Sequence, residues 1–159
     1  AIAIGAPDQI DIGIWIRDNI PQNAIVASNY FCENACHGAN WFEEDYKLLG
    51  DTYNFPPSPN GYGSFDMILP LYAERKFLIQ GSRFLLVNGM DRDEIRSRMK
   101  ATLDFANEPS PSSLKSLVDY EVSYFVVDTN ATNCKSWIPF AEKLYANNSY
   151  TVLRLLDSL

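Results

Sequence analysis

The sequence predicts an α/β fold in three layers, a Rossmann-like single domain over residues 1–159 with a mostly parallel sheet of four to five strands. Short apolar runs that suit strands covered on both faces recur along the chain. Segments whose apolar residues follow a helical period separate these runs. The chain has 159 residues, of which 47% are hydrophobic. It is therefore large enough to bury one core and too apolar for a disordered protein.

The first predicted elements are a helix over residues 8–19 and a strand over residues 24–28. Asp8 is the expected N-cap of this helix, and the proline at position 21 ends it because the residue before a proline avoids the α region. The apolar residues at helical offsets are Ile10, Ile14 and Trp15, with Ile12 and Ile16 on neighbouring rows. The run over 24–28 is continuously apolar, as expected for a buried strand.

The middle of the chain has weaker periodicity. Residues 30–66 are expected to form a long excursion, with a short helix around residues 41–48. One or two helical turns over 66–73 contain Pro70 and precede a second predicted strand over 76–80. The excursion therefore separates the first two strands of the predicted sheet.

The clearest helix covers residues 90–107. Asp91 is expected to cap it, and Glu94 lies three residues further on, as in a capping box. Its apolar stripe consists of Ile95, Met99, Leu103 and Ala106, with Phe105 on the flank. A second helix over 112–119 and a third buried strand over 124–128 follow.

The chain is expected to end with a helix over 135–144, a tight turn at residues 147–148 and a strand over 150–155. The residues of this last strand alternate enough to place it at the edge of the sheet. Because helices separate the predicted strands, most of the strand pairings are expected to be parallel.

Polar side chains follow three of the predicted strands. They are Asn29, Tyr30, Gln80, Arg83, Asp128 and Asn130. Ligands of open α/β sheets bind outside the carboxyl ends of the strands. These residues are therefore candidates for a polar pocket that binds a sugar, a phosphate or an acidic group, in which Arg83 would pair with the anion. The alternative is that they only mark the points where the backbone leaves the core.

The three cysteines, Cys32, Cys36 and Cys134, are candidates for a disulfide. A bridge from Cys134 to Cys32 or Cys36 would close about a hundred residues and stabilise the fold by roughly 4 kcal/mol. A local Cys32–Cys36 bridge and the absence of any bridge remain alternatives. Zinc binding with His37 is disfavoured because Cys134 has no partner at the usual spacing, so no metal site is predicted.

Composition excludes several classes of protein. The net charge of −7 argues against nucleic acid and anionic lipid as partners, because both require clustered Lys and Arg. No apolar run reaches the roughly 20 residues of a membrane-spanning helix. No cofactor is predicted, because Gly61 and Gly63 lack the third glycine of a dinucleotide-binding loop. No catalytic residue is predicted either, since the single histidine, His37, has no convincing nucleophile partner.

Three segments resemble parts of the polytopic membrane glycosyltransferases of the GT-C type in bacteria. Residues 15–29, Trp-Ile-Arg-Asp-Asn-Ile-Pro-Gln-Asn-Ala-Ile-Val-Ala-Ser-Asn, are similar to a segment that follows the last membrane helix and opens the extracytoplasmic domain. Residues 114–128 resemble the helix and strand of that domain, and residues 140–155 resemble its closing helix, turn and strand. The match does not extend to residues 31–70.

The resemblance implies a location on the extracytoplasmic face of the cell membrane. Because the chain begins at Ala1, we expect it to be excised from a larger protein whose membrane-embedded remainder is its first partner. The resemblance further implies a glycan or polyprenyl-linked sugar acceptor, and a catalytic carboxylate outside these residues. The domain would then bind the acceptor or serve a structural role. The alternatives are a carbohydrate or small-ligand binding module on a membrane tether, and a truncated free-standing α/β enzyme.

Overall fold

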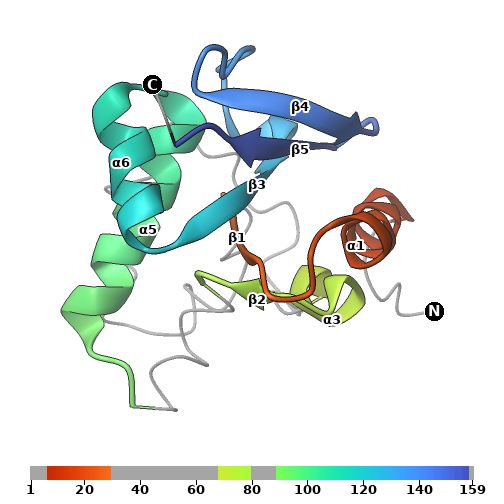
Figure 1. Ribbon diagram of the computed structural model, residues 1–159, viewed down its shortest axis with the longest axis horizontal. Coiled ribbons are helices and arrows are strands. Elements are labelled where there is room, and N and C mark those ends of the chain that lie inside the picture. The colour runs from red at the N-terminus through yellow and green to blue at the C-terminus, as the bar shows by residue number, and fades with distance from the viewer. Residues whose placement is uncertain (1–6, 30–67, 80–88, 158–159) are drawn as a thin grey trace.

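The computed structural model describes residues 7–29, 68–79 and 89–157, which form helices around one sheet (Figure 1). The α-helices are α1 (Pro7–Asn19), α3 (Ile68–Ala73), α5 (Arg92–Asn107) and α6 (Pro111–Asp119), and a 3-10 turn, η1, covers Thr129–Ala131. The strands are β1 (Ile25–Ser28), β2 (Lys76–Phe77), β3 (Val122–Asp128), β4 (Ala141–Ala146) and β5 (Tyr150–Leu155). The α/β class predicted from the sequence is therefore confirmed.

The sheet is mixed, in the order β2-β1-β3-β5-β4. β1 pairs in parallel with both β2 and β3. β5 pairs antiparallel with both β3 and β4. The expectation of a mostly parallel sheet thus holds for the first three strands only, because a short turn after Ala146 returns the chain as a hairpin. The result is an open α/β sheet that is not clearly a Rossmann fold.

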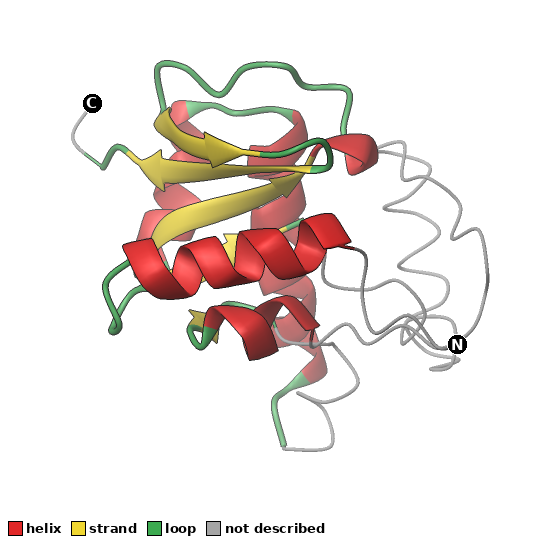
Figure 2. Ribbon diagram, turned by 90° about the vertical axis from the view of Figure 1, so that its right-hand side faces the viewer, coloured by secondary structure: helices red, strands yellow, loops and turns green. Residues whose placement is uncertain are grey.

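Helices cover both faces of the sheet and create two separate cores (Figure 2). The side chains of β3 alternate between them, as the period of a strand requires. Phe125 and Val127 pack with residues of α5 and α6, whereas Val126 packs with residues of α1 and α3. A strand covered on both faces must be apolar at successive positions, which explains the continuous apolar run of β3.

Helix α1 begins one residue earlier than predicted and uses a different face. Its first residue is Pro7, so Asp8 lies in the first turn instead of at the cap, and the Asp8 carboxylate accepts a hydrogen bond from Ser149 Oγ at 2.6 Å. Ile12 and Ile16 are fully buried, whereas Ile14 is 36% exposed. Both rows of isoleucines fit a helical period, and contact with the sheet and α3 decides which row is buried.

Helices α5 and α6 agree closely with prediction. Asp91 caps α5 by accepting hydrogen bonds from the backbone N–H groups of Asp93 and Glu94. The reciprocal capping box occurs in α6, where Ser110 and Ser113 bond to each other's backbone N–H groups. The predicted stripe of α5 is buried, and Phe105, expected on its flank, is also fully buried. Helix α5 therefore packs with a wider apolar face than the sequence pattern indicates.

The predicted helix over residues 135–144 is wrong. Trp137 begins a single turn, in which its carbonyl accepts from the N–H groups of Phe140 and Ala141. Pro139 cannot donate a backbone hydrogen bond, which disfavours extension of a helix through this segment. The chain instead forms β4, which pairs with β5 and is itself the terminal strand of the sheet. The prediction of β5 as an edge strand is therefore also wrong. β5 is almost completely buried because it lies between β3 and β4.

Candidate functional site

The carboxyl edge of the parallel strands brings together three of the predicted ligand-binding residues, Asn29, Asp128 and Asn130. Asn29 Nδ2 donates to the Asp128 carbonyl oxygen at 3.1 Å, and the Asp128 backbone N–H donates to Asn29 Oδ1 at 2.7 Å. The Asn130 backbone N–H donates to Asp128 Oδ1 at 3.0 Å. The buried amide of Asn29 therefore acts like one more backbone unit that joins the end of β1 to the end of β3. Tyr30, Gln80 and Arg83 lie outside the described residues.

Asn29→Ala is expected to lower the free energy of unfolding by about 1–3 kcal/mol, because it removes the two hydrogen bonds between the buried Asn29 amide and the Asp128 backbone. Chemical denaturation of the two proteins measures this difference. Asn130→Ala is the matched control, since Asn130 is exposed and only its backbone takes part in the contact. Equal stability of all three proteins would show that the Asn29 amide does not support the sheet.

Cys134 is a free thiol in the part of the chain that the structure describes. Its Sγ donates to the carbonyl oxygen of Ser136 at 3.2 Å. Cys32 and Cys36, its possible partners, lie outside the described residues, as does the helix predicted around residues 41–48. The predicted Cys134 bridge therefore stays a prediction.

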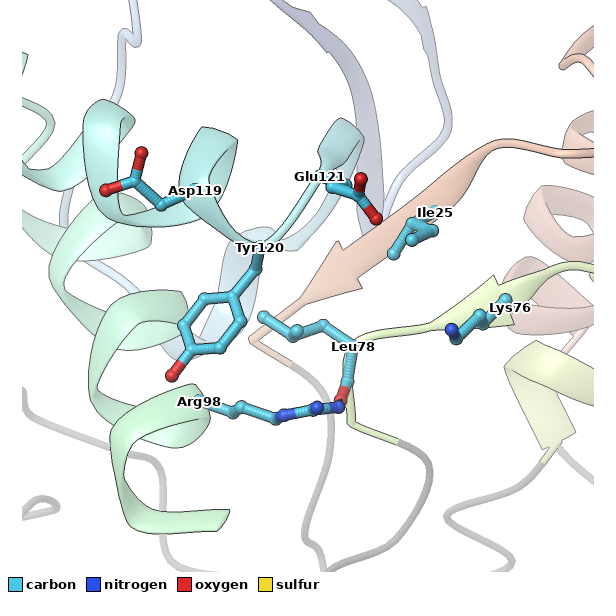
Figure 3. Close-up of a pocket in the computed structure, with 7 residues that line it drawn as sticks. All are labelled: Ile25, Lys76, Leu78, Arg98, Asp119, Tyr120 and Glu121. Carbon is cyan, nitrogen blue, oxygen red and sulfur yellow. The ribbon is translucent and has the colours of Figure 1, made fainter. Parts of the chain in front are cut away.

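A pocket of about 310 Å³ lies at the opposite, amino edge of the parallel strands (Figure 3). Its lining residues are Ile25, Lys76, Leu78, Arg98, Asp119, Tyr120 and Glu121. Ile25 and Lys76 are paired first residues of β1 and β2, and Ile25 also pairs with Val122, the first residue of β3. Ligand pockets in proteins occupy roughly 300–1,000 Å³, so this pocket is large enough for a small molecule.

Arg98 and Tyr120 form one wall of this pocket, and their side chains lie next to each other in Figure 3. Arg98 Nε donates to Glu94 Oε1 at 3.0 Å, and Arg98 Nη1 donates to the Leu78 carbonyl oxygen at 3.1 Å. The guanidinium carbon lies 5.5 Å from the centroid of the Tyr120 ring, within the range of a cation–π contact. Three separate contacts thus hold the guanidinium in place before any ligand arrives.

Glu121 places a negative charge in the pocket, and its backbone has a left-handed conformation. It follows the end of α6 with a φ of +64°, and its N–H donates to the Val118 carbonyl oxygen at 2.8 Å. A residue with a Cβ pays a steric cost in this conformation, which glycine avoids. Figure 3 shows the Glu121 carboxylate beside Ile25, on the side of the pocket away from Arg98.

The environment of Tyr120 raises the pKa of its hydroxyl, mainly through burial and then through the negative charge of Glu94. A raised folded-state pKa stabilises the protein at pH values below the unfolded pKa of about 10, and this contribution is lost as the pH rises through the folded pKa. We therefore expect the wild type to lose more stability above pH 10 than Tyr120→Phe. Urea denaturation followed by circular dichroism at pH 8, 10 and 11 measures the difference, and parallel losses in the two proteins would contradict it.

Sequence reasoning placed the candidate site at the carboxyl edge and missed the pocket at the amino edge. The pocket combines the beginnings of β1 and β2 with the end of α6 and one face of α5, which are far apart in the sequence. The sequence offered one signal for this pocket, which is a charged residue at the start of two apolar runs. These residues are Lys76 and Glu121. This signal is weak, because charged residues flank strands in many proteins.

Comparison with known proteins finds no matching family model, curated protein or solved structure. Among residues 7–29, 68–79 and 89–157, the structure contains no group of three His, Cys, Asp or Glu side chains that could hold a metal ion. No helix within these ranges is both long and apolar enough to cross a membrane.

Proposed function

We propose that this chain is the extracytoplasmic domain of a multi-pass membrane protein that resembles the GT-C-type glycosyltransferases. In this proposal the domain is not catalytic alone, and it either binds the acceptor of the whole protein or packs against its membrane-embedded part. The supporting observation is the spatial arrangement of the three segments that carry the resemblance. Residues 15–29 contain β1, residues 114–128 contain most of α6 and β3, and residues 140–155 contain β4 and β5.

The three segments whose sequences resemble the GT-C-type proteins are also adjacent in the folded chain. β1, β3, β5 and β4 are consecutive strands of one sheet, and α6 packs against β3. The third segment departs from the expected helix, turn and strand, because residues 141–146 form a strand. The resemblance therefore has its best structural support in the first two segments.

Expression of the complete reading frame in bacteria tests this proposal. We expect the protein to remain in the membrane after carbonate extraction. External protease treatment of spheroplasts should release a fragment of about the 18.0 kDa of this chain. Recovery of the complete protein in the soluble fraction would overturn the proposal. Binding of the released fragment to a panel of glycans and polyprenyl-linked sugars would favour the acceptor role, and no binding would favour the structural role.

The second candidate function is a small-ligand binding module, and the pocket at the amino edge is the observation that favours it. The pocket offers a fixed guanidinium, an aromatic ring and charges of both signs within about 310 Å³. Four of its seven lining residues are charged, and the other three, Ile25, Leu78 and Tyr120, are apolar or aromatic, so the pocket suits a small charged molecule with an apolar part. This function does not depend on a membrane attachment, so the isolated chain is sufficient to test it.

A further inference from the structure

The pocket at the amino edge holds two opposite charges that have no ion-pair partner among the described residues. One is the Lys76 ammonium group and the other is the Glu121 carboxylate, and both side chains are exposed. The remaining charges of the pocket are balanced by neighbours. Arg98 is paired with Glu94 at 3.0 Å, and Asp119 is paired with Lys115 at 2.6 Å. The two unbalanced groups therefore decide which ligand charge the pocket favours.

The sheet holds these two charges apart. Ile25 pairs with Lys76 on one side and with Val122 on the other, so Lys76 and Val122 are two strands apart. At about 4.8 Å per strand, the backbones of Lys76 and Val122 are separated by roughly 9.6 Å, and Glu121 directly precedes Val122. Both residues line the same pocket of about 310 Å³, which is large enough for a small molecule. Ile25 forms the apolar floor between the two charges.

We infer that this pocket binds an α-amino acid, with its carboxylate toward Lys76, its ammonium group toward Glu121 and an apolar side chain against Tyr120 and Leu78. The inference rests on the second candidate function, because it names the ligand class of that pocket. A simple anion would be attracted by Lys76 and repelled by Glu121. A simple cation would be attracted by Glu121 and repelled by Lys76. A neutral sugar would leave both charges without a counter-charge. A zwitterion offers an opposite charge to both groups at once.

The first experiment uses three ligands that share the branched alkyl chain of leucine and differ in their charged groups. L-leucine carries both charges, 4-methylpentanoate lacks the ammonium group, and isoamylamine lacks the carboxylate. We expect L-leucine to shift the backbone amide resonances of Ile25, Lys76 and Glu121 in a saturable NMR titration. Each analogue should bind about three- to tenfold more weakly than L-leucine, as expected for the loss of one exposed charge-assisted contact. Equal binding of all three ligands would overturn the inference.

Charge-removing variants test the same point from the side of the protein. Lys76→Met and Glu121→Gln should each weaken L-leucine binding by about three- to tenfold. Lys143→Met is the matched control, because Lys143 is exposed on β4, across the sheet from the pocket. Unchanged affinity in both pocket variants would overturn the inference.

A pair of glycine variants separates binding from stability. Glu74 and Glu121 both have a positive φ, of +50° and +64°, and glycine relieves the steric cost at both positions. Glu74→Gly and Glu121→Gly should therefore each raise the denaturation midpoint. Only Glu121→Gly should weaken L-leucine binding, since Glu74 does not line the pocket. Equal L-leucine affinity in the two variants would overturn the inference.

A glycan titration distinguishes failure of the inference from failure of the candidate function. If glucose or another neutral sugar shifts the pocket resonances and L-leucine does not, the amino-acid assignment is wrong and the small-ligand function stands. If neither class shifts them at high millimolar concentration, both are overturned. Neither result bears on the membrane attachment, which the extraction experiment tests separately.

Discussion

Phe125→Ala is expected to lower the free energy of unfolding by about 3–5 kcal/mol, because it leaves a cavity in the larger of the two cores that the described residues form. Phe125 is 0% exposed and lies on β3, which pairs with β1 on one side and β5 on the other. Its ring lies 5.2 Å from that of Phe105 on α5, with an interplanar angle of 52°. Urea denaturation of the two proteins measures the loss.

Ser123→Ala is the control for this prediction, because Ser123 is exposed on the same strand and should change stability by less than about 0.5 kcal/mol. The double variant with Phe105→Ala measures the coupling between the two rings, which we expect to be about 0.5–1.5 kcal/mol. A loss below 1 kcal/mol for Phe125→Ala would contradict the packing of β3 against α5.

Arg75→Met is expected to lower the free energy of unfolding by about 2–3 kcal/mol, because one guanidinium satisfies the carbonyl ends of two helices. Its Nη2 donates to the carbonyl oxygen of Arg17 in the last turn of α1 at 2.8 Å, and to that of Ile20, just after α1, at 2.6 Å. Its Nη1 donates to the Glu74 carbonyl at 3.0 Å, after the end of α3. The positive charge also lies where the dipoles of both helices are negative.

Two further variants isolate the geometry of this contact. Arg75→Lys should recover little of the loss, because a point charge cannot reach carbonyls in several directions as the planar fork does. Arg154→Met should cost at most about 1 kcal/mol, because Arg154 forms an exposed ion pair with Glu142. Thermal and urea denaturation compare the three proteins, and equal losses for Arg75→Met and Arg154→Met would contradict the helix-end role.

Local sequence signals predicted the elements whose ends and faces are specified by nearby residues. Asp91 caps α5, the stripe from Ile95 to Ala106 is buried, and β3 follows α6 as the apolar run indicated. The turn at residues 147–148 is also confirmed, since the Asn147 backbone N–H donates to the Tyr150 carbonyl oxygen. In each case the chemistry that forms the element lies within a few residues of it.

The errors occur where a distant partner decides the outcome. Residues 141–146 contain alanine, leucine and charged residues that suit a helix, yet pairing with β5 makes them a strand. The residues of β5 alternate weakly, yet its position between β3 and β4 buries it. Hydrogen bonds between strands depend on chain segments that a local pattern does not contain, so propensity yields to pairing here.

The same distinction applies to the two edges of the sheet. The sequence alone placed Asn29 and Asp128 at the ends of strands, but it could not show that the Asn29 amide bonds to the Asp128 backbone. It contained Arg98 and Tyr120 without any sign that they form one wall of a pocket. Helical period, capping and apolar runs are properties of neighbouring residues, and they established the α/β class. Strand order, the mixed sheet and the pocket arise from contacts between residues far apart in the chain, so only the folded structure decides them.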